Sequence, residues 1–330
     1  MPPPHAAAGL AAVPGRPAPR VVSLLPSATE ILVLIGGRPL LVGRSHECDF
    51  PPDLSGVPVV TASRIATGTS AEIHDAVQGA LGTGGQGLYQ LDAARIAALG
   101  PDVILTQDLC EVCSVDLGTV ERLAATLSTR PAVVSLNPAS LADVLDDVLR
   151  VGTAVGLERA AEDAVVQLRE RYWSAVDFVN GYVPGPEVAV LEWTDPPFVA
   201  GHWTPALVEA AGCRHSIGAA GARSRQVTPD ELLAAAPERV VICPCGLDLP
   251  RIRKELPALL AQPWWAALPA VRSGRPENVM VVDGNQMFSR PGPRLVDAFR
   301  WLVAWLQERP ELSPPGFPAM TADALLAAPV

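Results

Sequence analysis

Short runs of β-branched residues alternate with longer amphipathic stretches along the first half of the chain, from Arg20 onward. The run at 21–25 has the character of a strand that ends at Pro26, and two glycines stop the helical run at 31–35. The same pattern predicts further strands at 40–42, 57–60, 103–106 and 132–136, and helices at 93–99 and 120–127. Such an alternation favours a parallel sheet with right-handed crossovers.

A long amphipathic stretch separates this half from a second alternation. Apolar residues recur at helical spacing over 141–180, which predicts one long helix, bent near Gly156. The pattern then predicts strands at 188–192, 240–243 and 279–282, with helices at 205–211, 229–235 and 293–307. We therefore expect an α/β protein of two lobes with central parallel sheets, joined by one long helix, with a ligand cleft between the lobes.

Proline and glycine mark the boundaries of these lobes. The expected parts are a disordered tail at 1–19, an N-terminal α/β lobe at 20–140, a linking helix at 141–180, a C-terminal α/β lobe at 181–308 and a second tail at 309–330. The segment 67–87 is rich in glycine, so we expect it to be a flexible excursion of the first lobe and a candidate lid, with a short helix at 71–81.

Composition narrows the range of functions. Apolar residues make up 49% and charged residues 18% of the 330, and no apolar stretch approaches the roughly 18–20 residues of a membrane span. The absence of such a stretch argues against membrane insertion, and a formal net charge of −10 without a basic run argues against nucleic acid as a partner. Residues 1–19 lack the basic and apolar regions of a secretory signal, which predicts a cytoplasmic location with reduced cysteines. A misassigned start would instead allow a periplasmic or cell-surface location.

Cysteines follow the strands at one edge of the expected sheets, where open parallel sheets place their ligands. Thiolates with an imidazole suit zinc, copper(I), an iron–sulfur cluster or a cobalt centre. The alternatives are that these cysteines pack as small apolar side chains, which we expect for Cys213, or form disulfides if the protein is secreted. The candidate metal ligands are His46, Cys48, Cys110, Cys113, Cys243 and Cys245.

Aromatic residues gather after the first strand of the second alternation and would form a wall suited to a flat ligand, although aromatics at such positions also build cores. Asn285 and Phe288 follow the last expected strand, whereas His74 in the glycine-rich excursion is expected to be solvated. The residues of the wall are Trp193, Phe198, His202 and Trp203.

The motifs of common enzyme classes are absent. The sequence contains no Gly-x-Ser-x-Gly or His-Glu-x-x-His motif, and no Gly-x-Gly-x-x-Gly motif follows an expected strand, so no motif suggests an enzyme.

Five segments, through their order and spacing, resemble the helical-backbone class (class III) of ABC-transporter solute-binding proteins, most closely the cobalamin-binding type. The resemblance extends over about residues 20–307. It implies two α/β lobes bridged by a rigid helix, a corrinoid or iron chelate held in the cleft, a permease as partner, and no catalysis. The segments are 20–30 (RVVSLLPSATE), 42–52 (ending in CDFPP), 101–105 (PDVIL), 195–198 (DPPF) and 289–295 (SRPGPRL).

Two functions follow from these observations. In the first, the chain binds cobalamin or a related corrinoid or metal chelate without catalysis, as a solute-binding component or a cytoplasmic carrier. In the second, the cysteines and His46 bind a metal ion directly, as zinc or an iron–sulfur cluster, or serve a redox enzyme. For the first function, the expected ligand contacts are Pro26, Ser27, His46, Glu47, Cys48, Gln107, Trp193, Phe198, His202, Trp203, Asn285 and Phe288.

Overall fold

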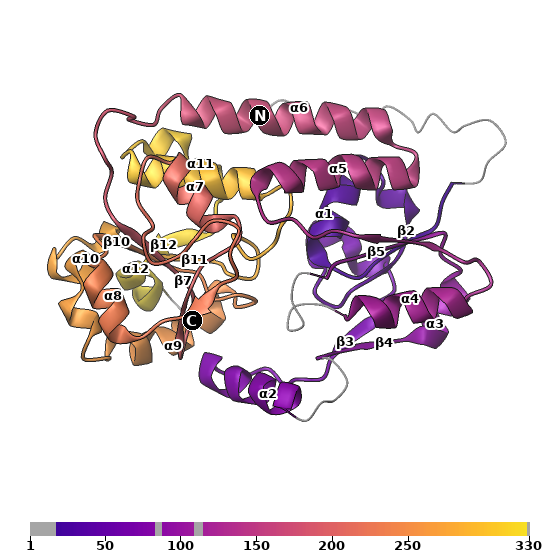
Figure 1. Ribbon diagram of the computed structural model, residues 1–330, viewed down its shortest axis with the longest axis horizontal. Helices are drawn as coiled ribbons and strands as arrows, with labels where there is room; N and C mark the ends of the chain where they lie inside the picture. Colours follow the sequence, from indigo (N-terminus) through magenta and orange to yellow (C-terminus); the bar gives the residue numbers. More distant parts are fainter. Residues whose placement is uncertain (1–17, 83–87, 109–114, 329–330) are drawn as a thin grey trace. The chain divides into compact units, whose positions relative to one another are not determined.

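The computed structural model describes residues 18–82, 88–108 and 115–328, which divide into two compact units (Figure 1). The first unit contains the described residues up to Arg64 together with Ala80–Pro138 and Val144–Gln167. The second contains Ile65–Gly79, Ala139–Asp143 and the chain from Leu168 onward. Each unit has a sheet with parallel strands and surrounding helices, so the predicted α/β class is confirmed.

The first unit is built on a four-stranded parallel sheet in the order β2-β1-β5-β6. Strand β5 is buried throughout, as expected for a central strand of a parallel sheet that helices cover on either side. The strand order reverses between β1 and β5, so the loops that follow these two strands flank the position where ligands bind in open sheets. The bounds are β1 (Val21–Ser23), β2 (Leu41–Arg44), β5 (Val103–Thr106) and β6 (Ala132–Ser135).

The helices of the first unit begin where the local chemistry favours a helix start. Asp92 and Asp116 each accept a hydrogen bond from the main-chain N–H three residues later, at 2.9 and 2.8 Å, and so cap α3 and α4. Pro26 occupies the first turn of α1, where a missing N–H costs nothing. The bounds are α1 (Pro26–Leu34), α3 (Ala93–Leu99) and α4 (Leu117–Thr126).

A separate antiparallel pair, β3 (Thr61–Ser63) with β4 (Tyr89–Leu91), also belongs to the first unit. Within the expected strand at 57–60, Val59 forms an isolated parallel bridge with Arg44 at the end of β2, and the regular strand β3 begins only at Thr61. Its partner β4 was not expected, because it comes immediately after the glycine-rich segment.

The second unit is built on a six-stranded sheet in the order β12-β11-β10-β7-β8-β9. The central strands β7, β10 and β11 are parallel, as predicted, whereas β8, β9 and β12 run antiparallel at the two sides. Three residues or fewer in each antiparallel strand leave too little alternation to detect in a sequence. The bounds are β7 (Val188–Thr194), β8 (Pro197–Val199), β9 (Arg225–Gln226), β10 (Arg239–Ile242), β11 (Val279–Val282) and β12 (Ala319–Thr321).

Helices on the second unit bury an apolar stripe against this sheet. The main helices are α7 (Thr204–Ala210), α8 (Pro229–Ala235), α9 (Leu249–Leu260), α10 (Pro269–Arg272) and α11 (Leu295–Leu306). Helix α9 was not predicted, because it holds Pro257 in its interior and its first turns carry mostly charged residues. Leu256 and Leu259 of α9 are nevertheless buried in the core of this unit.

The C-terminal segment, expected to be a tail, completes the sheet of the second unit. Strand β12 pairs with β11, and the following helix α12 (Ala322–Ala327) buries Leu325 in the core, where that side chain is 4% exposed. The prolines that suggested a tail lie outside β12 and α12, where they interrupt no main-chain hydrogen bond of either element.

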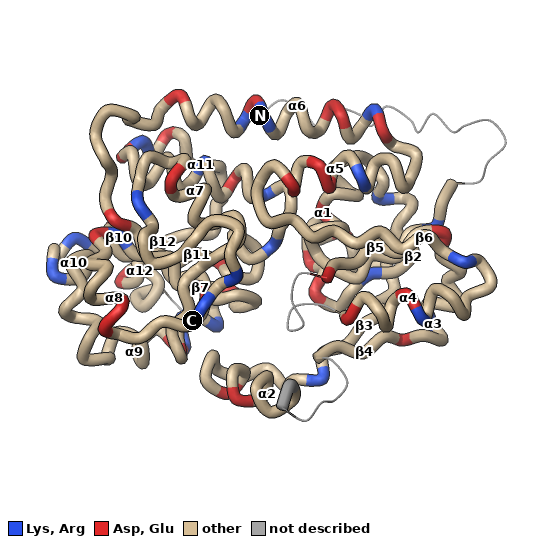
Figure 2. The backbone as a smooth tube through the Cα atoms, in the orientation of Figure 1, with Lys and Arg blue, Asp and Glu red and all other residues tan. Residues whose placement is uncertain are grey.

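The single long helix expected at 141–180 is two helices, α5 (Leu141–Val155) and α6 (Glu158–Val176). The break falls at Gly156, whose φ of +73° ends α5 in the left-handed conformation that favours glycine. A Cβ at Gly152 would collide with the side chain of Ala161, so the two helices pack closely beside the turn. Acidic and basic residues are interspersed along α6 (Figure 2).

The glycine-rich excursion also differs from the expectation. It contains α2 (Ser70–Gly82), begun by a capping pair in which Glu72 accepts hydrogen bonds from the main-chain N–H and hydroxyl of Thr69, at 2.9 and 3.0 Å. Residues 65–79 belong to the second unit, and Ile73 packs against its core. This part of the excursion is therefore a docked helix rather than a flexible extension of the first lobe.

Candidate ligand-binding site

The loops after β1 and β5 place three predicted ligand contacts in the first unit. Pro26 is half-buried at the start of α1, whereas Ser27 and Gln107 are 2% and 7% exposed. Of the three, Pro26 therefore offers the largest surface to a ligand.

A hydrogen-bonded group of polar side chains follows β2. The main-chain N–H of His46 donates to Thr61 Oγ1 at 3.0 Å, and His46 Nδ1 lies 2.7 Å from the same oxygen. Tyr89 of β4 donates its hydroxyl to Glu47 at 2.9 Å, and its ring lies 5.7 Å from that of His46. Tyr89 was not among the expected contacts, because it lies in a strand of three residues just after the glycine-rich segment.

Cys48 lies inside the first unit. Its side chain is 1% exposed, and its Sγ is 3.0 Å from Thr29 Oγ1, which in turn donates to Ser23 Oγ at 2.8 Å. This thiol is packed as a small buried side chain, and its role as a ligand to a metal or chelate stays a prediction.

In the second unit, Trp193 and Phe198 are register partners on the β7–β8 hairpin, and both are half-buried. The indole Nε1 of Trp193 donates to the carbonyl oxygen of Ser70 at 3.2 Å. The Phe198 ring lies 6.0 Å from the ring of His74, which is half-buried rather than fully solvated. These two aromatic side chains thus keep part of their surface accessible while α2 contacts both.

One carboxylate holds the start of α2 on the second unit. Glu255 of α9 accepts from the main-chain N–H of Ser70 at 2.8 Å and from the hydroxyl of the same residue. The Thr194 hydroxyl lies 2.9 Å from Ser70 Oγ and 3.2 Å from the Glu255 carboxylate. Ser70 is 1% exposed at the centre of this contact. We call Ser70, Thr194 and Glu255 the Glu255 clasp.

Three further predicted contacts of the second unit are buried or half-buried within its fold. Trp203 and Phe288 are 6% and 5% exposed, and the indole N–H of Trp203 donates to the Phe288 carbonyl oxygen at 2.7 Å. Asn285 is half-buried in the loop after β11 and accepts from the Arg290 guanidinium at 3.3 Å. Their contacts give all three a part in the fold, and their part in ligand binding stays a prediction.

His202 is a half-buried residue in a strained backbone conformation, with φ of +52°. Its main-chain N–H donates to Ala222 at 2.6 Å, and its carbonyl accepts from Gly221 at 2.8 Å, so the loop that ends β8 is fixed to the 218–225 loop. Burial, and then the positive charge of Arg223, lower the pKa of the imidazole below its ordinary 6.5.

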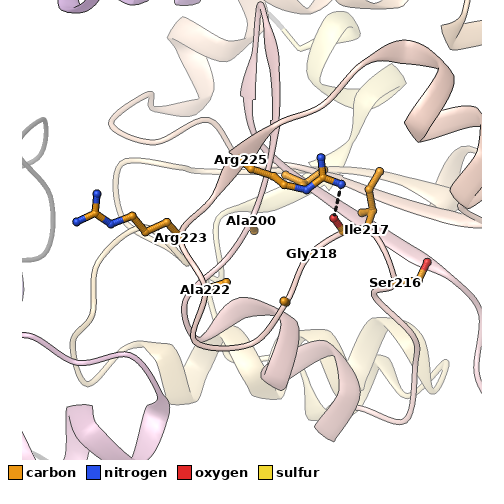
Figure 3. Close-up of a pocket in the computed structure, with 9 residues that line it drawn as sticks. Ala200, Ser216, Ile217, Gly218, Ala222, Arg223 and Arg225 are labelled. Atoms are coloured by element: carbon orange, nitrogen blue, oxygen red, sulfur yellow. Dashed lines mark hydrogen bonds between the residues drawn. The ribbon is translucent and has the colours of Figure 1, made fainter. Parts of the chain in front are cut away.

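A cavity of about 220 Å³ lies between the end of β8 and the 216–225 loop (Figure 3). Arg225 extends across it and donates to the Ile217 carbonyl oxygen at 3.1 Å, whereas Arg223 points away from the other lining side chains. The cavity is smaller than the roughly 300 Å³ at which ligand pockets begin, so a tetrapyrrole does not fit inside it.

The remaining cysteines occupy different environments. Cys243 is 1% exposed, and burial raises its pKa, helped by the nearby Cys245, Asp283 and Glu192, whereas Cys245 is exposed. Burial raises the pKa of Cys213 to about 11, in keeping with its expected role as a small apolar side chain.

The metal hypothesis depends on residues that are only partly described. Cys110 and Cys113 lie outside the described residues. Within the described part of the chain, no group of three or more His, Cys, Asp and Glu side chains is placed to hold a metal ion. A zinc or iron–sulfur site built on these cysteines therefore gains no support from the structure.

Several solved structures with a similar fold are named as heme-binding or vitamin B12-binding proteins. The chain is similar to a periplasmic heme-binding protein from Pseudomonas aeruginosa, with a TM-score of 0.66 and 23% identity over 92% of this chain and 96% of that one. For the periplasmic heme-binding protein RhuT from Roseiflexus the TM-score is 0.67 and the identity 21%, and the match covers 89% of this chain and 99% of that one. For the periplasmic vitamin B12-binding protein BtuF of Vibrio cholerae the TM-score is 0.63 and the identity 18%, and the match covers 89% of this chain and 99% of that one. No curated protein sequence matches the chain.

The family model described as "Periplasmic binding protein" matches residues 21–276. This match overturns the expected cytoplasmic location, since the family is one of periplasmic proteins. The wrong inference relied on the composition of residues 1–19, which lie outside the matched region. Within the described residues, no helix is both long enough and apolar enough to cross a membrane. Because the match extends over well more than half of its length, the chain belongs to the periplasmic binding protein family.

Proposed function

We propose that the chain binds cobalamin or a related metal chelate, such as heme or an iron siderophore, and delivers it to an ABC-transporter permease. The observation that carries the proposal is the pair Trp193 and Phe198, paired across β7 and β8 with part of each ring accessible. Adjacent aromatic faces suit the flat macrocycle of a tetrapyrrole, because stacking on them adds to the gain from burying apolar area.

Family membership supports the general part of this proposal. Periplasmic binding proteins are non-enzymatic solute-binding proteins that work with ABC-transporter permeases. The structural neighbours include heme-binding proteins and a vitamin B12-binding protein, so metal tetrapyrroles are the ligand class that their names share. Cobalamin is the more specific choice, and it rests on the resemblance of the sequence segments described above.

The test is a titration of the full chain with three probes: cyanocobalamin, hemin and a ferric hydroxamate siderophore. Visible absorbance and calorimetry report binding. We expect Trp193→Ala to weaken the affinity for the bound probe about fivefold, since one stacked aromatic contributes about 1 kcal/mol beyond its buried area.

The matched control is Trp173→Ala, which removes a tryptophan that is 60% exposed on α6 in the same unit. It is expected to leave the affinity unchanged. A wild-type chain that binds none of the three probes would contradict the proposed function, and equal affinities of the wild-type chain and both variants would remove Trp193 from the site.

A further inference from the structure

We propose that residues 65–79 form part of the ligand site of the second unit, and that Glu255 is a positioning residue that holds them against Trp193 and Phe198. This inference rests on the proposed function and adds to it a structural determinant of which ligands the chain accepts. It concerns contacts within the second unit, to which residues 65–79 belong.

The first step is how the segment is held. The internal capping pair of α2 uses Thr69 and Glu72, in which Glu72 accepts from the Thr69 N–H and Thr69 Oγ1 accepts from the Glu72 N–H. The N–H of Ser70 instead donates to Glu255, on a helix 185 residues away in the sequence. Glu255 thus supplies an acceptor at the first turn of α2, where a negative charge also interacts favourably with the helix dipole.

The second step connects this contact to the aromatic pair. The main chain of Ser70 makes two hydrogen bonds: its N–H donates to Glu255, and its carbonyl oxygen accepts from the indole N–H of Trp193. Removing the carboxylate would leave the Ser70 N–H without this acceptor and loosen the Ser70 main chain, although Thr194 still contacts the Ser70 hydroxyl. The carbonyl oxygen that accepts from the Trp193 indole would then be less firmly placed. The orientation of this indole therefore depends on Glu255 through one intervening residue.

The third step concerns what the segment brings to the site. His74 lies one turn after Ser70 on α2, with its ring 6.0 Å from that of Phe198. Ile73 beside it packs against the apolar core of the second unit, which fixes how α2 is seated. A metal chelate stacked on Trp193 and Phe198 would accordingly contact α2 as well as the hairpin, with an imidazole within reach of its polar arms or its metal.

The experiment compares the wild-type chain with Glu255→Ala, Glu255→Gln and the control Glu231→Ala. Glu231 is matched because it also accepts hydrogen bonds at the start of a helix of the second unit, from the N–H and hydroxyl of Thr228. Hydrogen exchange over residues 65–79 without ligand reports docking, and titration with the probe that the wild-type chain binds reports the ligand site.

We expect Glu255→Ala to abolish the protection of residues 65–79 and to weaken ligand affinity about tenfold, the usual scale for hydrogen bonds to a charged group. Glu255→Gln keeps one acceptor oxygen and should have an intermediate effect on both measurements. Glu231→Ala should change neither. A structural role alone would alter the protection but leave the affinity unchanged.

A double-mutant cycle with Trp193→Phe tests the positioning step. This substitution keeps an aromatic ring but removes the indole N–H, so the losses of affinity in Glu255→Ala and Trp193→Phe should be far from additive. Additive losses, unchanged affinity in Glu255→Ala despite lost protection, unchanged protection in that variant, or tighter binding would each overturn the inference. If the wild-type chain binds none of the probes, the proposed function fails and this inference fails with it, although the exchange data would still report whether Glu255 docks the segment.

Discussion

Two features of His202 are energetically unfavourable: its backbone conformation and the partial burial of its imidazole. A φ of +52° is unfavourable for a side chain with a Cβ, and a half-buried imidazole near Arg223 loses part of the hydration that its charged form needs. The main-chain bonds to the 218–225 loop compensate by fixing the turn between β8 and α7. His202, which the sequence predicts as a ligand contact, therefore also fixes the turn between β8 and α7 through its main chain.

The lowered pKa of His202 predicts a specific pH dependence. Below about pH 6.5 the unfolded chain takes up a proton at this imidazole while the folded protein resists it, so the free energy of unfolding should fall as the pH decreases through this range. His202→Asn, which tolerates the left-handed conformation, should reduce that fall. The difference should stay below about 1 kcal/mol, because water screens a half-exposed group.

Urea unfolding of the wild-type chain and His202→Asn, measured between about pH 7.5 and pH 5.5, checks this expectation. Arg223→Gln provides the internal comparison, since removing the second cause of the shift should make the wild-type pH dependence shallower. If the variant and the wild type lose stability in parallel, His202 is not the titrating group.

At the scale of helices and strands, the sequence predicted the bounds of an element most accurately where the element is a buried strand or a helix with a capping residue next to it. The strands at 103–106 and 279–282 and the helices at 93–99 and 229–235 match the structure residue for residue. Buried parallel strands give uninterrupted apolar runs, and the two helices are capped by Asp92 and Thr228. Each of these signals lies within a few residues of the element that it predicts.

The patterns failed where an element is very short, where a glycine allows either a bend or a break, and where distant residues decide the outcome. The pairing of β8 with β7 involves three residues that include a proline, and the break between α5 and α6 depends on how α6 packs back against Gly152. The residues of the candidate site likewise fall into those that the sequence predicted and those that it could not. The aromatic run at Trp193 was visible in the sequence, whereas the contact of Ser70 with Glu255 spans 185 residues and leaves no local signal.

Two helical glycines provide a prediction about the α5–α6 turn. Gly152→Ala places a methyl group against Ala161 in the packed turn and should destabilise the protein by about 1–3 kcal/mol. Gly79→Ala adds the same methyl group to α2, where nothing lies within 4 Å of it, and should be neutral or stabilise by up to about 1 kcal/mol. Chemical denaturation of both variants checks the opposite signs, and a neutral Gly152→Ala would argue against the close packing.

For the molecule as a whole, each unit has its own apolar core, and β12 and α12 complete the second one. Leu325→Ala should therefore destabilise the second unit by about 2–4 kcal/mol, the usual cost of truncating a buried leucine. Hydrogen exchange should become faster in β10 and β11 and stay unchanged in β1 and β5. Ala327→Ser, at an exposed position of the same helix, is the control. Equal acceleration in both units would contradict their division into separate cores.

The docking of residues 65–79 on the second unit also bears on the order in which the protein folds. A chain that becomes available from its N-terminus presents α2 long before Glu255, which comes 185 residues after Ser70. The segments of the first unit end at Gln167, and this unit can fold while residues 65–79 still lack their docking surface. During that interval the capping pair of Thr69 and Glu72 is the local support of the helix start, and Ile73 stays uncovered. The seating of α2 must therefore wait for α9, whereas the first unit can fold before it.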